Sequence, residues 1–244
     1  MLPRVSVVIP TWNEYPQIVR LLNSLKVQTL LPWEIIVVDK DSTDGTGKYS
    51  ERAGSRVIYD LGSVAAARNV GVKACSGDIV AFTEGDIVLP HGWVETITSK
   101  FSEDQKLLAV AGPGYPYDST GLSPNVVVEY LLYNRFRAFM SRLRYFMCSG
   151  YNMAVRREVF DSIQFPDIVP NDDGLFGHMV SGLGRTLFSM DLPVQISSRR
   201  FRKLGFAQAN LYYLFMIENI SPVFKPLTNM LRARSAEYFK KVKK

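Results

Sequence analysis

The stretch from Asp78 to Pro90, DIVAFTEGDIVLP, decides how the rest of the chain is interpreted. Its apolar run 79–82 is typical of a strand that is buried on both faces. The run ends in a turn where Glu84 and Asp86 flank Gly85. In open α/β sheets, ligands bind beyond the carboxyl ends of the strands. Two carboxylates there can hold Mg²⁺ or Mn²⁺ together with substrate phosphate oxygens, although a plain polar turn would show the same pattern.

Strand-like and helix-like segments alternate on both sides of this stretch. Strands are predicted at 5–10, 34–39, 56–59 and 107–111, and helices at 15–28, 64–74 and 91–101. Such alternation predicts an α/β fold with a mostly parallel central sheet and helices on both faces. Further on we predict a loop at 112–124, a helix at 125–146, extended chain at 150–155, a short helix at 157–161, a loop at 166–174, short strands at 186–190 and 194–198, a basic turn at 199–203 and a helix from 206 to about 219.

Composition narrows the class of protein. The 244 residues are 47% hydrophobic, which is ordinary for a globular protein and enough for a sizeable core. Two cysteines do not make a disulfide framework, and they favour a reduced, cytoplasmic setting. No export signal and no apolar run of about 18 residues is visible, so we expect no spanning helix.

The positive charge is unevenly distributed. Residues 225–244 hold seven of the 29 basic residues and one of the 23 acidic ones, so the tail carries the whole net charge of +6. A basic tail attracts anionic surfaces, either lipid or nucleic acid, or simply forms a solvated helix. The tail lacks any nucleic-acid reader motif, and we therefore expect no nucleic-acid partner.

Five blocks of the chain, in order, resemble inverting glycosyltransferases of family 2, which have the GT-A fold. They are VSVVIPTWNE (5–14), EIIVVDKDSTDGT (34–46), AAARNVGVKACSGDIVAFTEGD (65–86), SGYNMAVRREVF (149–160), and NDDG (171–174) followed by GLGR (182–185). Three features depart from the family pattern. Lys40 and Asp41 replace Asp and Gly, Glu84 replaces the usual Asp, and the stretch 197–201 lacks the histidine that some relatives supply as a metal ligand.

The resemblance implies a nucleotide-diphosphate-sugar donor, with UDP or GDP as the nucleotide. Asp39 would accept a hydrogen bond from the base, and Arg68 would reach the diphosphate through its guanidinium. The wall around base and ribose would be formed by Pro10, Thr11, Asn13 and Glu14, with Glu84 and Gly85 beside it. The alternatives are ordinary strand-to-helix turn chemistry for the wall and a helix-surface ion pair for Arg68.

The resemblance also implies a Mn²⁺ or Mg²⁺ ion with Asp86 as its principal ligand. Glu84 has a longer side chain than the usual Asp, so it would reach the metal, the ribose or neither. His91 and His178 are the only histidines in the chain, and His178 is interpreted as a packed helix residue. Water or the diphosphate would therefore complete the coordination.

Inversion requires a general base that removes the proton of the acceptor hydroxyl. The resemblance assigns this role to Asp173, with Asp172 as the competitor. An alignment shifted by one residue would make Asn171 and Asp172 the matching pair, but then Gly184 would lose its counterpart. Asp172 would otherwise cap the following helix or orient the acceptor, and a helix cap without any catalytic role is the alternative for the pair.

On the acceptor side the resemblance places Gly150, which allows close backbone approach, and Asn152. Arg199, Arg200, Arg202 and Lys203 would close on the diphosphate, hold a lipid phosphate of the acceptor, or form a solvated basic turn. The basic tail and the Arg- and aromatic-rich segment 125–146 suggest peripheral contact with an anionic membrane that carries a lipid-linked acceptor. Packing within the protein is the alternative for the aromatic residues.

We therefore predict a GT-A catalytic domain at 1–205, with a donor half at about 1–110 and an acceptor half at about 111–205, and a helical basic tail at 206–244. The predicted function is metal-dependent inverting sugar transfer to a hydroxyl or lipid-linked acceptor. The alternatives are a polyprenyl-phosphate sugar synthase, similar to dolichol-phosphate-mannose synthase, and a catalytically inactive nucleotide-sugar-binding protein.

Overall fold

The computed structural model describes residues 2–117, 124–168 and 172–197. The chain divides into two compact units, 1–198 and 199–244. The second unit lies outside the described residues, and so do the predicted basic turn at 199–203, the helix from 206 to about 219 and the tail at 206–244.

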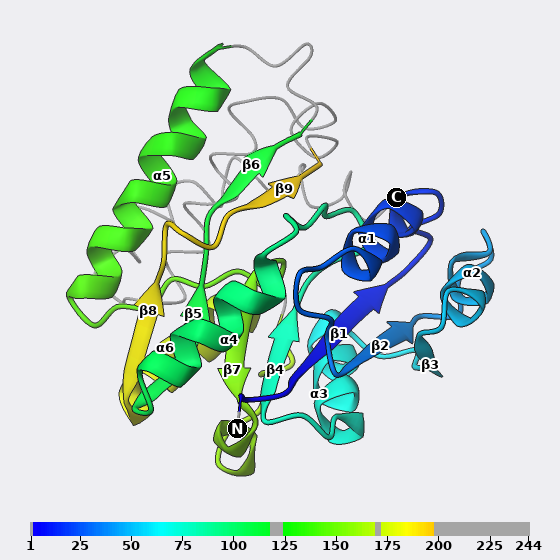
Figure 1. The fold of residues 1–244 in the computed structure, drawn as a ribbon, viewed down its shortest axis with the longest axis horizontal. Helices are drawn as coiled ribbons and strands as arrows, with labels where there is room; N and C mark the ends of the chain where they lie inside the picture. Colours follow the sequence, from blue (N-terminus) through cyan, green and yellow to red (C-terminus); the bar gives the residue numbers. More distant parts are fainter. Residues whose placement is uncertain (1, 118–123, 169–171, 198–244) are drawn as a thin grey trace, which may run out of the picture. The chain divides into compact units, whose positions relative to one another are not determined.

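A seven-stranded sheet forms the centre of the first unit, in the order β3-β2-β1-β4-β7-β5-β8 (Figure 1). Its strands are β1 (Val5–Thr11), β2 (Glu34–Asp39), β3 (Arg56–Tyr59), β4 (Ile79–Phe82), β5 (Leu107–Ala111), β7 (Met153–Arg156) and β8 (Arg185–Phe188). All pairings are parallel except those of β7, which runs antiparallel to both β4 and β5. The predicted mostly parallel α/β sheet is thereby confirmed.

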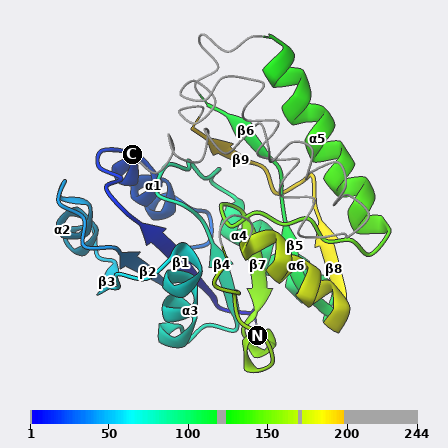
Figure 2. The same ribbon diagram turned by 180° about the vertical axis from the view of Figure 1, so that it is seen from behind.

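Helices cover both faces of this sheet. They are α1 (Gln17–Lys26), α2 (Thr46–Arg52), α3 (Val64–Ala74), α4 (Trp93–Glu103), α5 (Pro124–Arg142), the 3-10 helix η1 (Arg157–Asp161) and α6 (Asp172–Leu183). Figure 1 shows α1 and α4 in front of the sheet, and Figure 2 shows α3 and α6 covering the opposite face. This layering leaves the carboxyl ends of β1, β2 and β4 open to a common edge.

Aromatic rings anchor α6 to the sheet. Phe176 of α6 stacks on Phe165 with ring centroids 4.0 Å apart and on Phe160 at 5.4 Å. Phe165 in turn meets Phe82, the last residue of β4, edge to face at 5.1 Å. These rings belong to one buried cluster that also contains Val8 of β1. The first turn of α6 is therefore fixed over the end of β4.

The structure differs from the sequence prediction in two places near this edge. The predicted loop 112–124 contains β6 (Gly114–Pro116), which pairs in parallel with β9 (Val194–Ile196) as a separate two-stranded sheet. The predicted loop 166–174 ends earlier than expected, because Asp172 and Asp173 already lie in the first turn of α6.

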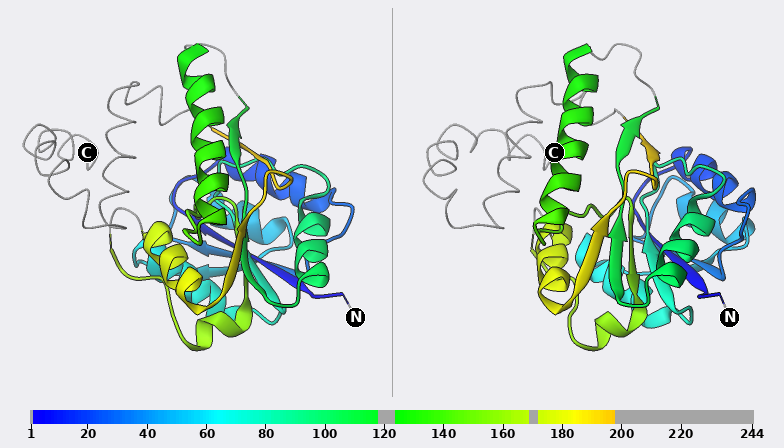
Figure 3. Two further views of the ribbon diagram at one scale, coloured as in Figure 1. Left: turned by 90° about the vertical axis from the view of Figure 1, so that its left-hand side faces the viewer. Right: turned by 60° about the vertical axis from the view of Figure 1, so that its left-hand side comes forward.

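The helix predicted at 125–146 also ends early, at Arg142. Arg144 has a left-handed φ of 61° and donates its N–H to the Ser141 carbonyl, while the N–H of Tyr145 reaches the Met140 carbonyl. This is a Schellman motif with arginine at the position that glycine usually occupies. Figure 3 shows α5 as a long helix beside β6.

Candidate functional site

The ends of β1 and β2 meet at a buried carboxylate. Asp39 closes β2 and is completely buried. Its Oδ1 accepts hydrogen bonds from the Thr11 hydroxyl at 3.0 Å and the Ser42 hydroxyl at 2.5 Å, and its Oδ2 accepts one from the Ser42 N–H at 3.2 Å. Pro10 is buried next to Thr11 in β1. The structure thus brings Pro10, Thr11 and Asp39 together at the predicted nucleotide wall.

The two loops that follow these strands are cross-linked. The Asn13 N–H donates to the Ser42 hydroxyl at 2.8 Å, and the Asn13 side-chain oxygen accepts from the Thr43 N–H at 3.0 Å. Asn13 reaches both partners from a left-handed conformation with φ 53°, which asparagine tolerates better than most residues. The Glu14 N–H donates to the Thr46 hydroxyl at 2.9 Å. Sequence analysis assigned no role in the site to Ser42 or Thr46.

Asp44 also links the loop after β1 to the loop after β2. Its carboxylate accepts from the N–H and hydroxyl of Thr46 at the start of α2, and from the Tyr15 N–H at 2.8 Å. Burial would raise the pKa of Asp44, but these hydrogen bonds outweigh it and lower the pKa below its usual value. Asp44 therefore supports the start of α2 through Thr46, although Gly45 is the N-cap residue.

The turn after β4 carries the predicted metal ligands. The Ile87 N–H donates to the Glu84 carbonyl at 3.2 Å and closes the turn that contains Gly85 and Asp86. A Cβ atom on Gly85 would lie 2.8 Å from the Cβ of Glu14, so this turn packs directly against the β1–α1 loop. Within residues 2–117, 124–168 and 172–197, no group of three or more metal-ligating side chains gathers.

Arg68 occupies the centre of the site. It is 2% exposed, and its guanidinium forms ion pairs with Asp172 through Nη1 and with Glu84 through Nη2 at 3.2 Å. Burial would lower the pKa of Arg68, but the surrounding carboxylates, led by Asp172, raise it. Arg68 therefore joins the turn after β4 to helix α6. Its predicted contact with a diphosphate stays a prediction, since the arginine already pairs with two carboxylates.

Asp172 and Asp173 lie side by side in α6 but have different partners. Burial raises the pKa of the Asp172 carboxyl, the Arg68 guanidinium opposes that shift and Asp173 adds to it. The Asp173 carboxylate accepts the Gly150 N–H through Oδ2 and its neighbour Gly174's N–H through Oδ1, both at 2.8 Å. Asp173 thus accepts two backbone hydrogen bonds, which fix the orientation of its carboxylate.

Gly150 makes this arrangement possible. A Cβ atom at Gly150 would overlap the Arg68 guanidinium, so only glycine lets the two segments approach this closely. Its predicted place on the acceptor side stays a prediction, while its contacts to Arg68 and Asp173 are observed. The five residues Arg68, Glu84, Gly150, Asp172 and Asp173 form one connected cluster, which we call the carboxylate cluster.

Asn152 has a different environment. Its side chain is fully buried, accepts from the Trp93 indole N–H at 2.9 Å and donates to the Leu192 carbonyl at 2.7 Å. These bonds join β7 to α4 and to the segment before β9. In this structure Asn152 braces the interior, and its predicted place on the acceptor side stays untested.

Sequence analysis did not identify the special role of Arg137. This α5 residue is fully buried, and its guanidinium donates to the Met147 carbonyl at 2.8 Å, the Ser149 hydroxyl at 3.0 Å and the Tyr151 hydroxyl at 3.1 Å. The bonded residues flank Gly150. Arg137 therefore holds the loop whose backbone N–H contacts Asp173, and nothing in the helical pattern of α5 indicated that contact.

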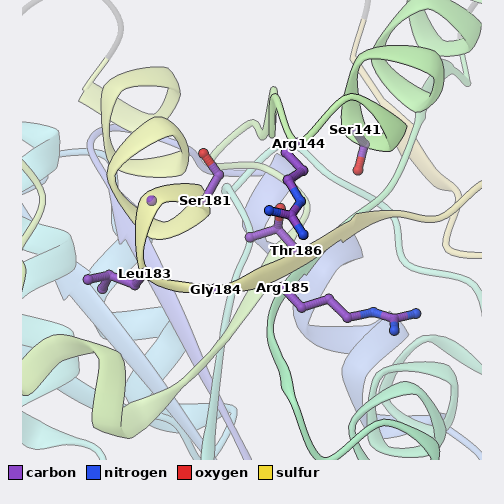
Figure 4. A pocket seen from close by; sticks show the side chains of 8 residues that line it. Ser141, Arg144, Ser181, Leu183, Gly184, Arg185 and Thr186 are labelled. Atoms are coloured by element: carbon purple, nitrogen blue, oxygen red, sulfur yellow. The ribbon is translucent and has the colours of Figure 1, made fainter.

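A cavity of about 310 Å³ lies elsewhere, between the ends of α5 and α6 and the start of β8. In Figure 4, Arg144 extends toward Thr186, while Arg185 points away; Arg185 pairs with Asp104 at 2.7 Å. The lining residues include no carboxylate and none of the predicted site residues. We therefore place the candidate chemistry at the strand ends and not in this cavity.

Four predicted phosphate contacts fall outside the described residues: Arg199, Arg200, Arg202 and Lys203. Among the described helices, none combines the length and apolar character that a membrane span requires.

The sequence is similar to known glycosyltransferases. The family model described as Glycosyl transferase family 2 matches residues 6–164. The glycosyltransferase AglE of Haloferax volcanii is 29% identical over 192 residues, which cover 74% of this chain and 59% of that protein. EpsJ of Bacillus subtilis, described as an uncharacterized glycosyltransferase, is 34% identical over 121 residues, covering 47% of this chain and 35% of that protein. The chain thus spans roughly a third to three fifths of these two relatives.

Solved structures share the fold. The mannosyltransferase PcManGT of Pyrobaculum calidifontis, in complex with GDP-Man and Mn²⁺, superposes with a TM-score of 0.71 at 24% identity, covering 94% of this chain and 69% of that one. Glucosyl-3-phosphoglycerate synthase of Mycobacterium tuberculosis, in complex with Mn²⁺, UDP and its product, gives 0.62 at 23% identity, covering 89% and 79%. At these identities the likeness establishes the fold alone.

Proposed function

The chain belongs to glycosyl transferase family 2, and from this membership we propose that it transfers a sugar, with inversion, from a nucleotide-diphosphate sugar to a hydroxyl or lipid-linked acceptor. One observation carries the proposal. The carboxylate cluster lies beside the cross-linked loops at the ends of β1 and β2, where ligands of open α/β sheets bind.

The donor would occupy the open ends of β1, β2 and β4. Asp39, the last residue of β2, is the proposed acceptor of a hydrogen bond from the base. The loop that contains Asn13 and Glu14 would support the ribose. Proteins in the same fold class are described with GDP-Man or UDP bound, which supports a UDP or GDP donor here.

The donor set fits a divalent cation. Glu84 and Asp86 supply hard oxygen ligands from one turn, and Mg²⁺ or Mn²⁺ sites are commonly completed by substrate phosphates and water. Asp86 is the proposed principal ligand. Glu84 shares its carboxylate with Arg68 at 3.2 Å, so we propose that it contributes at most one oxygen. When bound, such an ion neutralises charge on a leaving diphosphate.

Asp173 is the proposed general base. Backbone N–H groups of Gly150 and Gly174 fix the position of its carboxylate, while Asp172 is paired with Arg68. A fixed, ionised carboxylate can accept the proton of an acceptor hydroxyl as its oxygen attacks the anomeric carbon. Inversion then follows from attack on the face opposite the leaving nucleotide.

The basic residues near the end of the chain bear on the acceptor and on where the protein acts. The basic residues of 225–244 favour an anionic membrane surface and a lipid-linked acceptor, with peripheral attachment at the cytoplasmic face. Arg199, Arg200 and Arg202 are proposed to bind phosphate of the donor or acceptor. A polyprenyl-phosphate sugar synthase is the variant of this function in which the acceptor is the lipid phosphate itself.

A thermal-shift screen of UDP- and GDP-sugars, with and without Mn²⁺, tests the donor and metal together. A ligand that binds only the folded state raises the melting temperature, and at about 100 times its Kd it adds about 2.7 kcal/mol. We expect one nucleotide class to act only with Mn²⁺. Asp86→Asn should abolish the metal-dependent shift, while Asp161→Asn on exposed η1 should keep it.

No shift with any nucleotide sugar would contradict the proposed function. A shift without release of nucleoside diphosphate, even with acceptor lipids present, would instead identify the inactive nucleotide-sugar-binding protein. Both outcomes are read from the same purified chain.

A further inference from the structure

Helix α5 has two chemically different faces, and one of them packs against the protein. The inward face is formed by Asn134, Arg137 and Ser141, all buried. Asn134 donates to the Gly114 carbonyl of β6 at 3.1 Å, and the Ser141 hydroxyl accepts the Phe188 N–H of β8 at 2.9 Å. These three polar residues of α5 therefore face inward, and Asn134 and Ser141 fix the helix to the two sheets.

The opposite face of α5 is apolar and exposed. It consists of Val128, Leu132, Phe136, Phe139 and Leu143, each between 45% and 61% exposed. Successive members are three or four residues apart, so they form one stripe about 20 Å long, which we call the α5 stripe. Figure 3 shows the helix at the side of the described unit, with β6 on one side of it only.

Positive charge lies next to the α5 stripe. Arg135 and Arg142 are exposed on the same helix, and Arg144 is exposed just beyond its end. The α5 sequence contains a single acid, Glu129, whose side chain lies outside the structural description. An apolar stripe bordered by arginines is the pattern of a helix that lies in the interface of an anionic membrane.

We propose that the α5 stripe is a docking surface for an anionic lipid bilayer. The aliphatic and aromatic side chains would enter the acyl boundary while the arginines contact lipid phosphates. Charge selects this occupant over two others. A second copy would present the same arginines, and the tail 225–244 carries seven basic residues and one acid, so charge disfavours both. Charge does not disfavour segment 206–224, which has one acid and no basic residue, so coverage of the α5 stripe by this segment is an outcome of the test below.

The docking proposal rests on the proposed function in one respect: a lipid-linked acceptor would give the protein a reason to approach a membrane. The docking itself depends on the contacts and exposure of α5. Donor binding at the strand ends is measured separately, so failure of one proposal can be distinguished from failure of the other.

Vesicle co-sedimentation of the full chain tests the docking surface. The native protein should bind mixed phosphatidylcholine–phosphatidylglycerol vesicles and bind pure phosphatidylcholine much more weakly. Leu132→Gln/Phe139→Gln should reduce the partition coefficient at least about tenfold, because two half-exposed side chains lose their burial in lipid. The matched control is Leu2→Gln/Leu31→Gln, since both leucines are 63% exposed outside α5 and should leave binding unchanged.

Two further variants test the contribution of the arginines to vesicle binding and the insertion of the α5 stripe into the bilayer. Arg135→Gln/Arg142→Gln should weaken binding to anionic vesicles by roughly fivefold for each arginine and reduce its salt dependence. Phe139→Trp should add fluorescence that brominated lipids quench, which binding through the tail alone would not produce.

Three outcomes would overturn the proposal. The first is equal vesicle binding by the stripe variant and the leucine control, and the second is no binding of the native chain to anionic vesicles at low salt. The third is a fall of several degrees in the melting temperature of the stripe variant without vesicles, or a change in its oligomeric state. That result would mean that protein, either this chain or a second copy, covers the α5 stripe.

Discussion

At the residue scale, the centre of the site is a buried guanidinium between two acidic segments. Arg68 of α3 pairs with Glu84 after β4 and with Asp172 at the start of α6. Each carboxylate alone would be costly to bury, and the arginine offsets part of that cost. The same three charges also define where a diphosphate and its cation would have to enter. Arg68 therefore links the stability of the fold to the proposed chemistry.

Arg68→Met should destabilise the protein by about 3–5 kcal/mol, because it leaves Asp172 buried without its cation. Urea unfolding measures the change. Adding Asp172→Asn to Arg68→Met should recover part of the loss, since the uncompensated charge is then gone. If Arg68→Met lowered the free energy of unfolding by less than about 1 kcal/mol, the ion pairs of Arg68 would not be what holds α6 to the turn after β4.

Both cysteines should be unreactive in the folded protein. Burial raises the pKa of Cys75 to about 12, and burial together with Asp173 raises the pKa of the Cys148 thiol well above its usual value. At pH 8 the reactive thiolate of Cys75 is then about one molecule in ten thousand. Ellman's reagent should therefore find no rapidly reacting thiol in the native chain and two after unfolding. Rapid native reaction of either thiol would contradict this burial.

At the element scale, the loop between α5 and β7 depends on a side chain that lies outside it. Arg137 of α5 supplies three hydrogen bonds to residues 147–151, and the same loop donates the Gly150 N–H to Asp173. The loop conformation, and with it the position of the proposed base, is thus set by helix α5. The Schellman motif that ends α5 at Arg142 directs the chain back toward this loop.

Arg137→Lys should lower the free energy of unfolding by about 2 kcal/mol. Lysine keeps the buried charge but cannot reproduce the forked geometry, so buried acceptors among Met147, Ser149 and Tyr151 lose their donor. Arg135→Lys, two residues away and exposed, should stay within about 0.5 kcal/mol of the native chain. Equal stability of the two variants in urea unfolding would contradict the role given to Arg137.

At the scale of the whole molecule, loops that are distant in sequence share one edge of the sheet. The register of β1 with β2 and β4 brings Thr11 beside Asp39 and the β1–α1 loop against Gly85. Position 172 reaches the same edge only because α6 packs its phenylalanine over Phe165. The proposed site is thus a product of the strand order, because β1 and β2 contribute Thr11 and Asp39 and the other residues lie on loops and helices that meet at the same edge.

The pH dependence of stability should reflect three surface carboxylates that hold this framework. Glu34 accepts from Ser6 and Ser76, Asp44 from Thr46, and Asp78 from Arg4; these hydrogen bonds outweigh burial at Glu34 and Asp44, and the Arg4 N–H bond is the largest cause at Asp78. The pKa of each is lowered below its usual value of 4.5 or 3.8.

Each of these carboxylates stabilises the folded state fully when the pH is above its unfolded-state pKa. This stabilisation is lost as the pH falls through the lower pKa of the folded state. The raised pKa of Asp172 acts in the opposite direction and offsets part of the loss. We expect the melting temperature to fall steadily below about pH 4, and to fall less in Asp78→Asn. An unchanged melting temperature down to pH 2 would contradict these contacts.

Sequence predicted this framework well where local patterns decide the structure. Strands 79–82 and 107–111 matched because continuous apolar runs and flanking turns specify buried strands. The bounds of strand 56–59 matched as well, although this edge strand is partly exposed. Predictions failed where a distant partner decides. The β6–β9 pair forms between short segments about 80 residues apart, and α5 ends at an arginine in a conformation that usually requires glycine.

The same division holds for the site. Asp39 and Glu84 were predicted as site residues from their positions at strand ends and from the family resemblance, and Asp172 and Asp173 were predicted from the resemblance alone. Their partners could not be predicted, because the pairing of Arg68 with two carboxylates depends on how α3, α6 and the β4 turn pack. The burial of Asn152 and the role of Arg137 were invisible for the same reason.

The most direct test of the account is the rate at which Asp173→Asn releases nucleoside diphosphate from its sugar donor in the presence of Mn²⁺ and acceptor. Removing the proposed base should reduce this rate by about 10²–10⁴-fold, while calorimetry shows donor affinity within about twofold of the native value. Asp161→Asn should retain the native rate. Full turnover by Asp173→Asn would contradict the assignment of the base and the mechanism built on it.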